Sequence, residues 1–201
     1  GSLPGTATGT LTGDGGSLTL DVQLQPSGSI TGVVSRSDGV TPAPPSIVSL
    51  MVGSQRFTTT TNELGQYGFD LVPAGTRTIT VDVLGSIDTA TASAVVVAGQ
   101  TTPVLIQLIG VGAIAGSAQT SNGLPIGGTV TLTGTGAASW SSTFTINPDG
   151  SFAASQVLAG PFSAQVRNTV GGITLYGTNT GVVIPGQTAP VIVTLESTGE
   201  I

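Results

Sequence analysis

Cysteine, histidine and lysine are all absent from this chain of 201 residues. Their absence excludes disulfide bonds, thiolate nucleophiles, imidazole acid–base catalysis and zinc sites built from cysteine and histidine. Schiff bases and Lys–Asn isopeptide cross-links are excluded as well, because both need a lysine amine. Serine is plentiful, but the bases that usually activate a serine nucleophile are missing. We therefore expect no enzyme activity, no catalytic residue and no cofactor.

Charge is scarce and mostly negative. Four arginines stand against ten acidic residues, which gives a net charge of −6 and a pI of about 4.1. Nucleic acids and anionic membrane surfaces need clustered basic side chains, so neither is an expected partner. The most apolar stretch, residues 104–118, contains Gln107 and is shorter than the roughly 20 residues of a membrane-spanning helix. Membrane insertion is not expected.

The residues that are present favour short β-strands. Hydrophobic residues make up 38% of the chain and the mean hydropathy is +0.39, which is too apolar for a disordered protein despite 31 glycines and 12 prolines. Threonine, valine and isoleucine prefer strands, and glycine and proline divide them into short segments. No segment has the 3.6-residue period of an amphipathic helix.

A motif bounded by glycines recurs along the chain. It stands at residues 28–32 (GSITG), returns at residues 112–116 (GAIAG) and begins again at residues 199–201 (GEI). A fixed spacing of about 85 residues is typical of tandem domains, each large enough for a modest core of its own. The sequence therefore predicts a piece of a tandem array.

The spacing also sets the expected domain boundaries. Residues 28–111 and 112–198 are predicted to be two complete β-sandwich repeats, and residues 199–201 the start of a following repeat. Residues 1–27 are predicted to be the terminal hairpin of a preceding repeat.

Three alternating aliphatic residues precede each copy of the motif. They are Leu20, Val22 and Leu24; Val104, Ile106 and Leu108; and Val191, Val193 and Leu195. Alternation places each trio on one face of a strand, and we expect that face to be buried. Two arrangements are open for the hairpin at residues 1–27. It folds back on the first repeat, or it completes the sheet of another molecule, because unpaired edges invite pairing.

Each repeat is expected to be an antiparallel, immunoglobulin-like β-sandwich of about seven strands, with essentially no helix. Turn signals recur every 8–12 residues, as such sandwiches require. One is residues 62–65 (NELG), where Gly65 is expected to have a positive φ and Asn62 to bond its own backbone. Tyr67, and Phe152 at the same place in the second repeat, are expected in the core.

These motifs resemble the carboxypeptidase regulatory-like family. The first repeat carries the pattern in residues 28–32, 62–69 (NELGQYGF), 71–75 (LVPAG) and 79–81 (ITV), and the second in residues 112–116, 147–150 (NPDG), 152 and 158–160 (LAG). The resemblance implies a transthyretin-like (prealbumin-like) sandwich, close to the Cna-B modules of surface adhesins. It also implies accessory, spacer or adhesive roles in secreted and cell-surface proteins. Cna-B relatives often carry a Lys–Asn isopeptide bond, which this chain cannot form.

Asn147 and Asp149 are the candidates for a calcium site. They supply one amide and one carboxylate within a single turn, whereas Ca²⁺ takes six to eight oxygens, usually from several carboxylates. A structural turn is the preferred interpretation, and no metal is expected.

Tyr176 and Trp140 are the candidates for a ligand site, because exposed aromatic rings can stack on sugars. Trp140 alternates with Phe144 and Ile146, which favours burial at the end of the core. Tyr176 is the less constrained of the two.

The expected function is a non-catalytic structural repeat, a spacer, stalk or adhesive rod, of a large secreted or cell-surface protein, with a bacterial source favoured. The alternatives are a carbohydrate- or protein-binding module, and a filament subunit assembled by β-strand complementation. The expected partners are neighbouring repeats, another protein or a glycan, and other copies bound through the N-terminal hairpin. The expected location is extracellular or at the cell surface.

Overall fold

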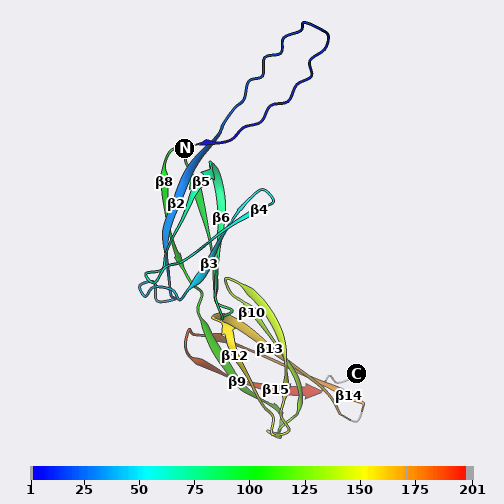
Figure 1. Cartoon of the computed structure of the whole chain (residues 1–201). Coiled ribbons are helices and arrows are strands. Elements are labelled where there is room, and N and C mark those ends of the chain that lie inside the picture. The colour runs from blue at the N-terminus through cyan, green and yellow to red at the C-terminus, as the bar shows by residue number, and fades with distance from the viewer. Residues whose placement is uncertain (1, 171, 198–201) are drawn as a thin grey trace. The chain divides into compact units, whose positions relative to one another are not determined.

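The chain folds into β-strands joined by turns and loops (Figure 1). The structure, a computed structural model, describes residues 2–170 and 172–197. None of these residues is helical, which confirms the predicted all-β class. The described part of the chain accordingly offers no helix capable of spanning a lipid bilayer. Residues 199–201, where a third copy of the glycine motif is predicted to begin, lie outside the described residues.

Two compact units make up the chain. Unit 1 comprises Gly1–Leu84 and Ala90–Leu108, and unit 2 comprises Gly85–Thr89 and Ile109–Ile201.

Unit 1 is a sandwich of two sheets. Its strands are β1 (Ser2–Leu3), β2 (Gln25–Ser35), β3 (Ser46–Val52), β4 (Gln55–Thr60), β5 (Gln66–Pro73), β6 (Gly75–Val83), β7 (Thr89–Val96) and β8 (Thr101–Gln107). In one sheet β2 lies between β5 and β8, with the short β1 at its start. The other has the order β4-β3-β6-β7. Buried side chains from both sheets form one core, among them Ile30, Val48, Ile79 and Ile106.

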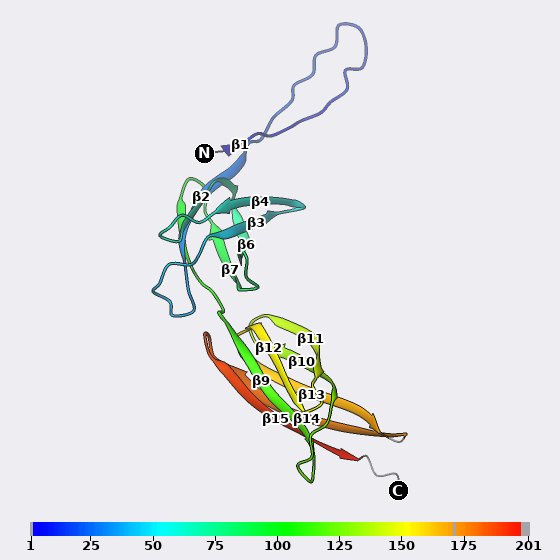
Figure 2. The same cartoon turned by 60° about the horizontal axis from the view of Figure 1, so that its bottom comes forward.

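Unit 2 repeats this plan. Its strands are β9 (Val111–Thr120), β10 (Gly128–Thr135), β11 (Ser139–Ile146), β12 (Ser151–Leu158), β13 (Gly160–Val170), β14 (Ile173–Val183) and β15 (Thr188–Ser197). Strand β9 lies between β12 and β15, and the second layer has the order β11-β10-β13-β14 (Figure 2). A short pairing of β14 with β15 joins the two layers at one edge. Unit 2 thus has seven strands, and unit 1 has seven besides the two-residue β1, in agreement with the predicted number of about seven.

One strand pair in each unit departs from the expected antiparallel pattern. Strand β2 runs parallel to β8 in unit 1, and β9 runs parallel to β15 in unit 2. The first and last strands of a sandwich can pair in this way because the whole intervening chain serves as the crossover connection.

The recurrent glycine motif belongs to a strand with a neighbour on each side, which is β2 between β5 and β8 in unit 1 and β9 between β12 and β15 in unit 2. Ile30 and Ile114, at the middle of the two copies, are both fully buried. A Cβ at Gly32 would clash with the carbonyl oxygen of Val104, and a Cβ at Gly116 with that of Val191. Glycine is therefore required where this strand passes close to its parallel neighbour.

The N-terminal hairpin differs from the prediction. Residues 4–24 include no strand, and Leu20, Val22 and Leu24 are about half exposed instead of buried. Two limbs extend from the start of β2 and meet at a turn around residues 13–15 (Figure 1). The three aliphatic residues do alternate along the chain, as predicted. Their side chains stay exposed because no second sheet covers them.

Candidate functional site

Three side chains of unit 2 form a row across neighbouring strands. The backbone register pairs Tyr176 on β14 with Arg167 on β13 and with Glu196 on β15. All three are exposed, and Tyr176 exposes 41% of its surface. The guanidinium carbon of Arg167 lies 5.5 Å from the centre of the Tyr176 ring, a cation–π contact. A cation, an aromatic ring and a carboxylate thus stand side by side.

A shallow depression of about 320 Å³ adjoins this row. It is lined by Tyr176, Gly177, Thr178, Thr194 and Glu196. A Cβ at Gly177 would lie 2.5 Å from the carbonyl oxygen of Thr194, so glycine lets β14 approach β15 at this point. Arg167 contacts the ring but does not line the depression. The depression therefore offers an aromatic ring, a carboxylate and two hydroxyls to a small polar ligand.

Trp140 lies apart from Tyr176. It is on β11, which β10 and β13 separate from β14 in the sheet. Its indole ring covers Gly134 on β10, where a Cβ would clash with the indole nitrogen. The side chain is partly buried and packs against the core of unit 2. The structure therefore does not bring the two aromatic candidates into one site.

Asn147 and Asp149 use their polar atoms within their own turn. The Asn147 amide nitrogen donates a hydrogen bond to Ser151 Oγ at 3.0 Å. Asp149 Oδ1 accepts from the backbone nitrogen of Ser151 at 2.9 Å and from its hydroxyl at 2.7 Å. These bonds, the one from the Ser151 hydroxyl first, lower the pKa of the Asp149 carboxyl. Within the described residues, no three acidic side chains gather around a point that a metal ion could occupy.

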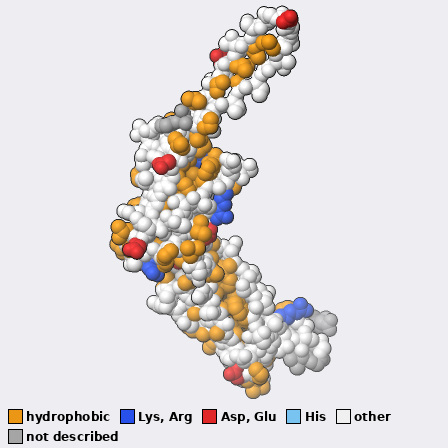
Figure 3. Space-filling model, viewed as in Figure 1, with side chains coloured by type: hydrophobic (Ala, Val, Ile, Leu, Met, Phe, Trp, Pro, Cys, Tyr) orange, Lys and Arg blue, Asp and Glu red, His pale blue; other side chains and the backbone are white. Residues whose placement is uncertain are grey.

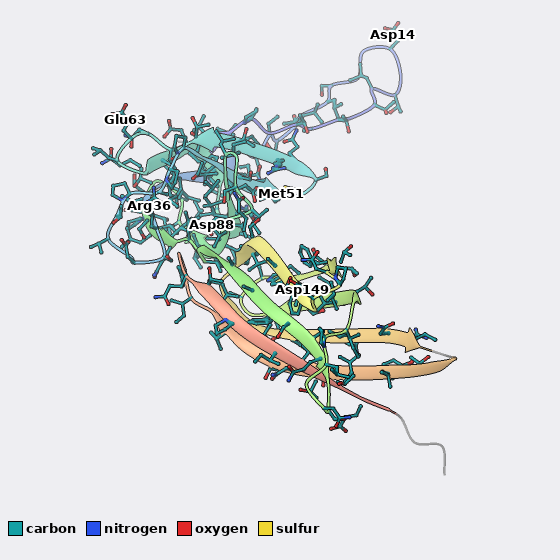
Figure 4. All side chains as sticks on the ribbon, turned by 90° about the horizontal axis from the view of Figure 1, so that it is seen from below. Asp14, Arg36, Met51, Glu63, Asp88 and Asp149 are labelled. Atoms are coloured by element: carbon teal, nitrogen blue, oxygen red, sulfur yellow. The ribbon has the colours of Figure 1, made fainter. Side chains whose placement is uncertain are left out.

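A second depression, of about 310 Å³, lies in unit 1 beside the turn between β7 and β8. Its lining includes Asp70, Gln100, Ser29 and the backbone of Gly28 and Gly99. Asp70 is the one carboxylate in this lining, whereas glycoside hydrolysis uses a pair of carboxylates. Figure 4 shows other acids of unit 1, Asp14 at the tip of the hairpin and Glu63 on a turn, well apart from each other.

The sequence reasoning missed Arg167 and Glu196 as neighbours of Tyr176. Arg167, Tyr176 and Glu196 come from three different strands. Their proximity therefore depends on the register of β13, β14 and β15. The spacing of residues along the chain carries no direct signal of that register.

No family model matches the chain, and no curated protein matches it. Solved structures match in fold. GBS52, the minor pilin of Streptococcus agalactiae, aligns with a TM-score of 0.57 and 12% identity over 86% of this chain and 97% of that one. A streptococcal ancillary pilin gives a TM-score of 0.44 and 10% identity, over 89% and 65% of the two chains. Shaft pilin SpaA from Lactobacillus rhamnosus GG gives 0.36 and 9%, over 87% and 99%.

At these identities the likeness concerns the fold alone. The match to the minor pilin covers nearly all of that protein and most of this chain. The chain is therefore structurally similar to Gram-positive pilin domains, and its units are immunoglobulin-like β-sandwich modules.

Proposed function

We propose that this chain is a non-catalytic structural segment of a bacterial cell-surface protein, in which consecutive sandwiches act as a spacer or stalk. The observation that carries the proposal is the presence of two sandwiches of identical strand order in one chain with a pilin-like fold. Each has its own core, as tandem structural arrays require. Neighbouring sandwiches of the same polypeptide are then the main partners.

A stalk must resist stretching, which single-molecule force spectroscopy measures directly. We expect two separate unfolding events when the chain is pulled from its ends. Each should release about 25 nm of chain, since roughly 80 residues extend by about 3.5 Å each before the folded length is subtracted. Full extension is expected because the lysine-free chain has no Lys–Asn cross-link to shorten it. One continuous low-force extension would contradict the proposal.

We also propose that residues 1–27 are the last hairpin of a sandwich of the same kind. The turn glycine of this hairpin, Gly15, has a φ of +84°, close to the +72° of Gly99 and Gly186 in the corresponding turns of units 1 and 2. Leu20 and Val22 alternate and are exposed, which fits a segment that would form a strand once a second sheet covered it.

A second candidate function is carbohydrate recognition at Tyr176. The specific observation is the depression in which a ring, the Glu196 carboxylate and two threonine hydroxyls converge. Sugars are bound by such combinations, the ring stacking on C–H groups and the polar atoms bonding hydroxyls. A glycan array tests it: the signal should disappear with Tyr176→Ala and persist with the matched control Phe57→Ala, an exposed aromatic of unit 1. Absence of any signal in the unmodified chain would eliminate this candidate.

A further inference from the structure

We propose that Asn122, on the loop between β9 and β10, is a site of spontaneous covalent modification. Its side-chain amide is lost as ammonia, and the residue becomes aspartate or isoaspartate. Water is the co-reactant. The proposal concerns the chemistry of one turn of unit 2, and it goes beyond the structural role above and does not depend on it.

The reaction begins with an attack by the backbone. The backbone nitrogen of Gly123 bonds to Cγ of Asn122, and the side-chain nitrogen leaves with the proton of the attacking nitrogen, as ammonia. The product is a five-membered succinimide ring. Water then adds to one of the two ring carbonyls, which gives aspartate, or to the other, which gives isoaspartate. Glycine obstructs this attack least because no Cβ stands beside its nitrogen.

The sequence and the space around the turn both favour Asn122. It is the one asparagine that precedes a glycine, whereas those at positions 62, 147, 168 and 179 precede glutamate, proline and two threonines. Asn122 and Gly123 are both exposed. Gly123 has a φ of +78°, and a Cβ built on it would have no other atom within 4 Å. The ring can therefore form without displacing a packed side chain.

Hydrogen bonds hold the side chains of the other four asparagines. The amide nitrogens of Asn62, Asn147, Asn168 and Asn179 donate to Gln66 Oε1, to Ser151 Oγ and to the carbonyl oxygens of Gly127 and Ile192, respectively. Within residues 2–170 and 172–197, the side chain of Asn122 makes no hydrogen bond. It is therefore free to turn its Cγ toward the nitrogen of Gly123.

The matching turn of unit 1 shows which bonds are missing. Asp38 likewise precedes a glycine, and its carboxylate accepts hydrogen bonds from the backbone nitrogens of the two residues after that glycine. In unit 2 the first of these nitrogens, that of Leu124, donates to Thr120 Oγ1 at 3.1 Å instead. The second belongs to Pro125, which has no N–H. The turn of unit 2 thus offers neither donor to Asn122.

One hydrogen bond opposes the reaction. The backbone nitrogen of Gly123 donates to the carbonyl oxygen of Thr120 at 2.9 Å, so it can attack only when the turn opens. Exposed turns open at a small cost in free energy, whereas strands open at a large one. We therefore expect folding to slow the reaction of Asn122 by less than about tenfold, and that of Asn168 on β13 and Asn179 on β14 by much more.

The products alter both the charge and the backbone of the turn. Either product adds one negative charge to a chain whose net charge is −6. Because charged side chains are few, as Figure 3 shows for the drawn face, ion exchange should resolve this change. Isoaspartate also routes the main chain through Cγ. The backbone then lengthens between Thr120 and Leu124, whose N–H and carbonyl oxygen are joined at 2.8 Å.

Incubation of the full chain for several weeks in mildly alkaline buffer tests the proposal. An acidic species should accumulate on ion exchange, and mass spectrometry of peptic fragments should place the exchange of nitrogen for oxygen at Asn122. This fragment should be modified at least about tenfold faster than those that contain Asn168 or Asn179. Stepwise N-terminal sequencing of the fragment should stop at residue 122 in much of the product, which identifies isoaspartate.

Two variants serve as controls. Asn122→Gln should abolish the acidic species, because the longer side chain closes a ring much more slowly. Asn179→Gln, a matched change at another exposed position, should leave its rate of formation unchanged. Circular dichroism melting should show that both variants remain folded.

Three results would overturn the proposal. The first is a folded chain in which Asn122 reacts no faster than Asn168 and Asn179. The second is a product that contains aspartate without isoaspartate, since direct hydrolysis of the amide would explain it. The third comes from the same incubation in urea. If folding slows Asn122 as strongly as it slows Asn179, the open turn does not select the site.

Discussion

The hydroxyl of Tyr67 donates a hydrogen bond to the carbonyl oxygen of Val104 at 3.1 Å. Tyr67 is on β5 and Val104 on β8, the two neighbours of β2. The bond passes over Gly32, where a Cβ would lie 2.8 Å from the tyrosine oxygen. In unit 2 the ring of Phe152 lies over Gly116 in the same way and has no hydroxyl. The two units therefore share a packing arrangement but not this hydrogen bond.

Tyr67→Phe should lower the free energy of unfolding of unit 1 by about 1 kcal/mol, the usual net contribution of a buried hydrogen bond. The measurement is urea denaturation followed by circular dichroism. The fluorescence of Trp140, the single tryptophan, provides an internal control because it lies in unit 2. A shift of equal size in the tryptophan transition would show that the effect is not confined to unit 1.

Alkaline pH should destabilise unit 1 through the same residue. Burial raises the pKa of Tyr67 to about 12. Because the pKa in the unfolded chain is about 10, the folded state holds the proton more tightly. This stabilisation is complete below pH 10 and is lost as the pH rises toward 12. Melting temperatures across that range should fall more steeply for the unmodified chain than for Tyr67→Phe, and equal slopes would contradict the assignment.

Gly32→Ala should destabilise unit 1 by about 3 kcal/mol or more, because its Cβ would overlap the carbonyl oxygen of Val104 and force β2 from β8. Gly68→Ala on β5 is the matched control, since the nearest atom to its Cβ would be the Ile30 carbonyl oxygen at 3.7 Å. Denaturation curves of the two variants compare them directly. Similar stabilities would show that the strands can separate at little cost.

Acidification should weaken the loop after β2 through Asp38. Its carboxylate accepts a hydrogen bond from the Thr41 hydroxyl and others from the backbone nitrogens of Val40 and Thr41. These bonds, the one from the Thr41 hydroxyl first, lower the pKa of Asp38 below its ordinary value near 3.8. The stabilisation is therefore present above about pH 4 and is lost as the pH falls through the lowered pKa.

The variant Asp38→Ala should accordingly lose less stability than the unmodified chain between pH 5 and pH 2, as measured by thermal melting. Asp14→Ala, at the tip of the N-terminal hairpin, is the control for the change in net charge (Figure 4). Identical pH profiles for Asp38→Ala and Asp14→Ala would rule out a specific contribution from Asp38.

Hydrogen exchange should distinguish the N-terminal hairpin from the strands that it resembles in sequence. The amides of residues 18–24 lie outside any strand, and they should exchange within seconds. The amides of residues 104–107, within β8, should be protected by several orders of magnitude. Mass spectrometry of peptic fragments resolves the two segments, and comparable protection would mean that the hairpin has found a covering surface.

Local signals in the sequence were sufficient for most of the fold. Asn62 accepts hydrogen bonds from the backbone nitrogens of Leu64 and Gln66, and Gly65 has a φ of +72°, as the turn pattern predicted. These features depend on a few adjacent residues. The same holds for the burial of Tyr67 and Phe152, since strand alternation fixes which side chains face the core.

Features that depend on distant segments were not predictable. Leu71 and Gln156 have positive φ values of 54° and 52°, unusual for residues other than glycine. Each lies where the register shifts between the edge strand and its central neighbour, which is a β-bulge in both units. The exposure of Leu20 and the alignment of Arg167 with Tyr176 likewise depend on which distant strands pair. The residues next to them in the sequence do not indicate that pairing.

The parallel pairing of β2 with β8 has a mechanical consequence. The chain enters unit 1 through β2 and leaves it through β8, so tension applied at the two ends pulls these strands in opposite directions along their length. Register pairs from Ser29 with Thr101 to Ser35 with Gln107 then bear the load in shear, all at once. Hydrogen bonds sheared together rupture at far higher force than bonds that unzip one after another. The arrangement recurs between β9 and β15, so tension on unit 2 also loads the hydrogen bonds between its first and last strands in shear.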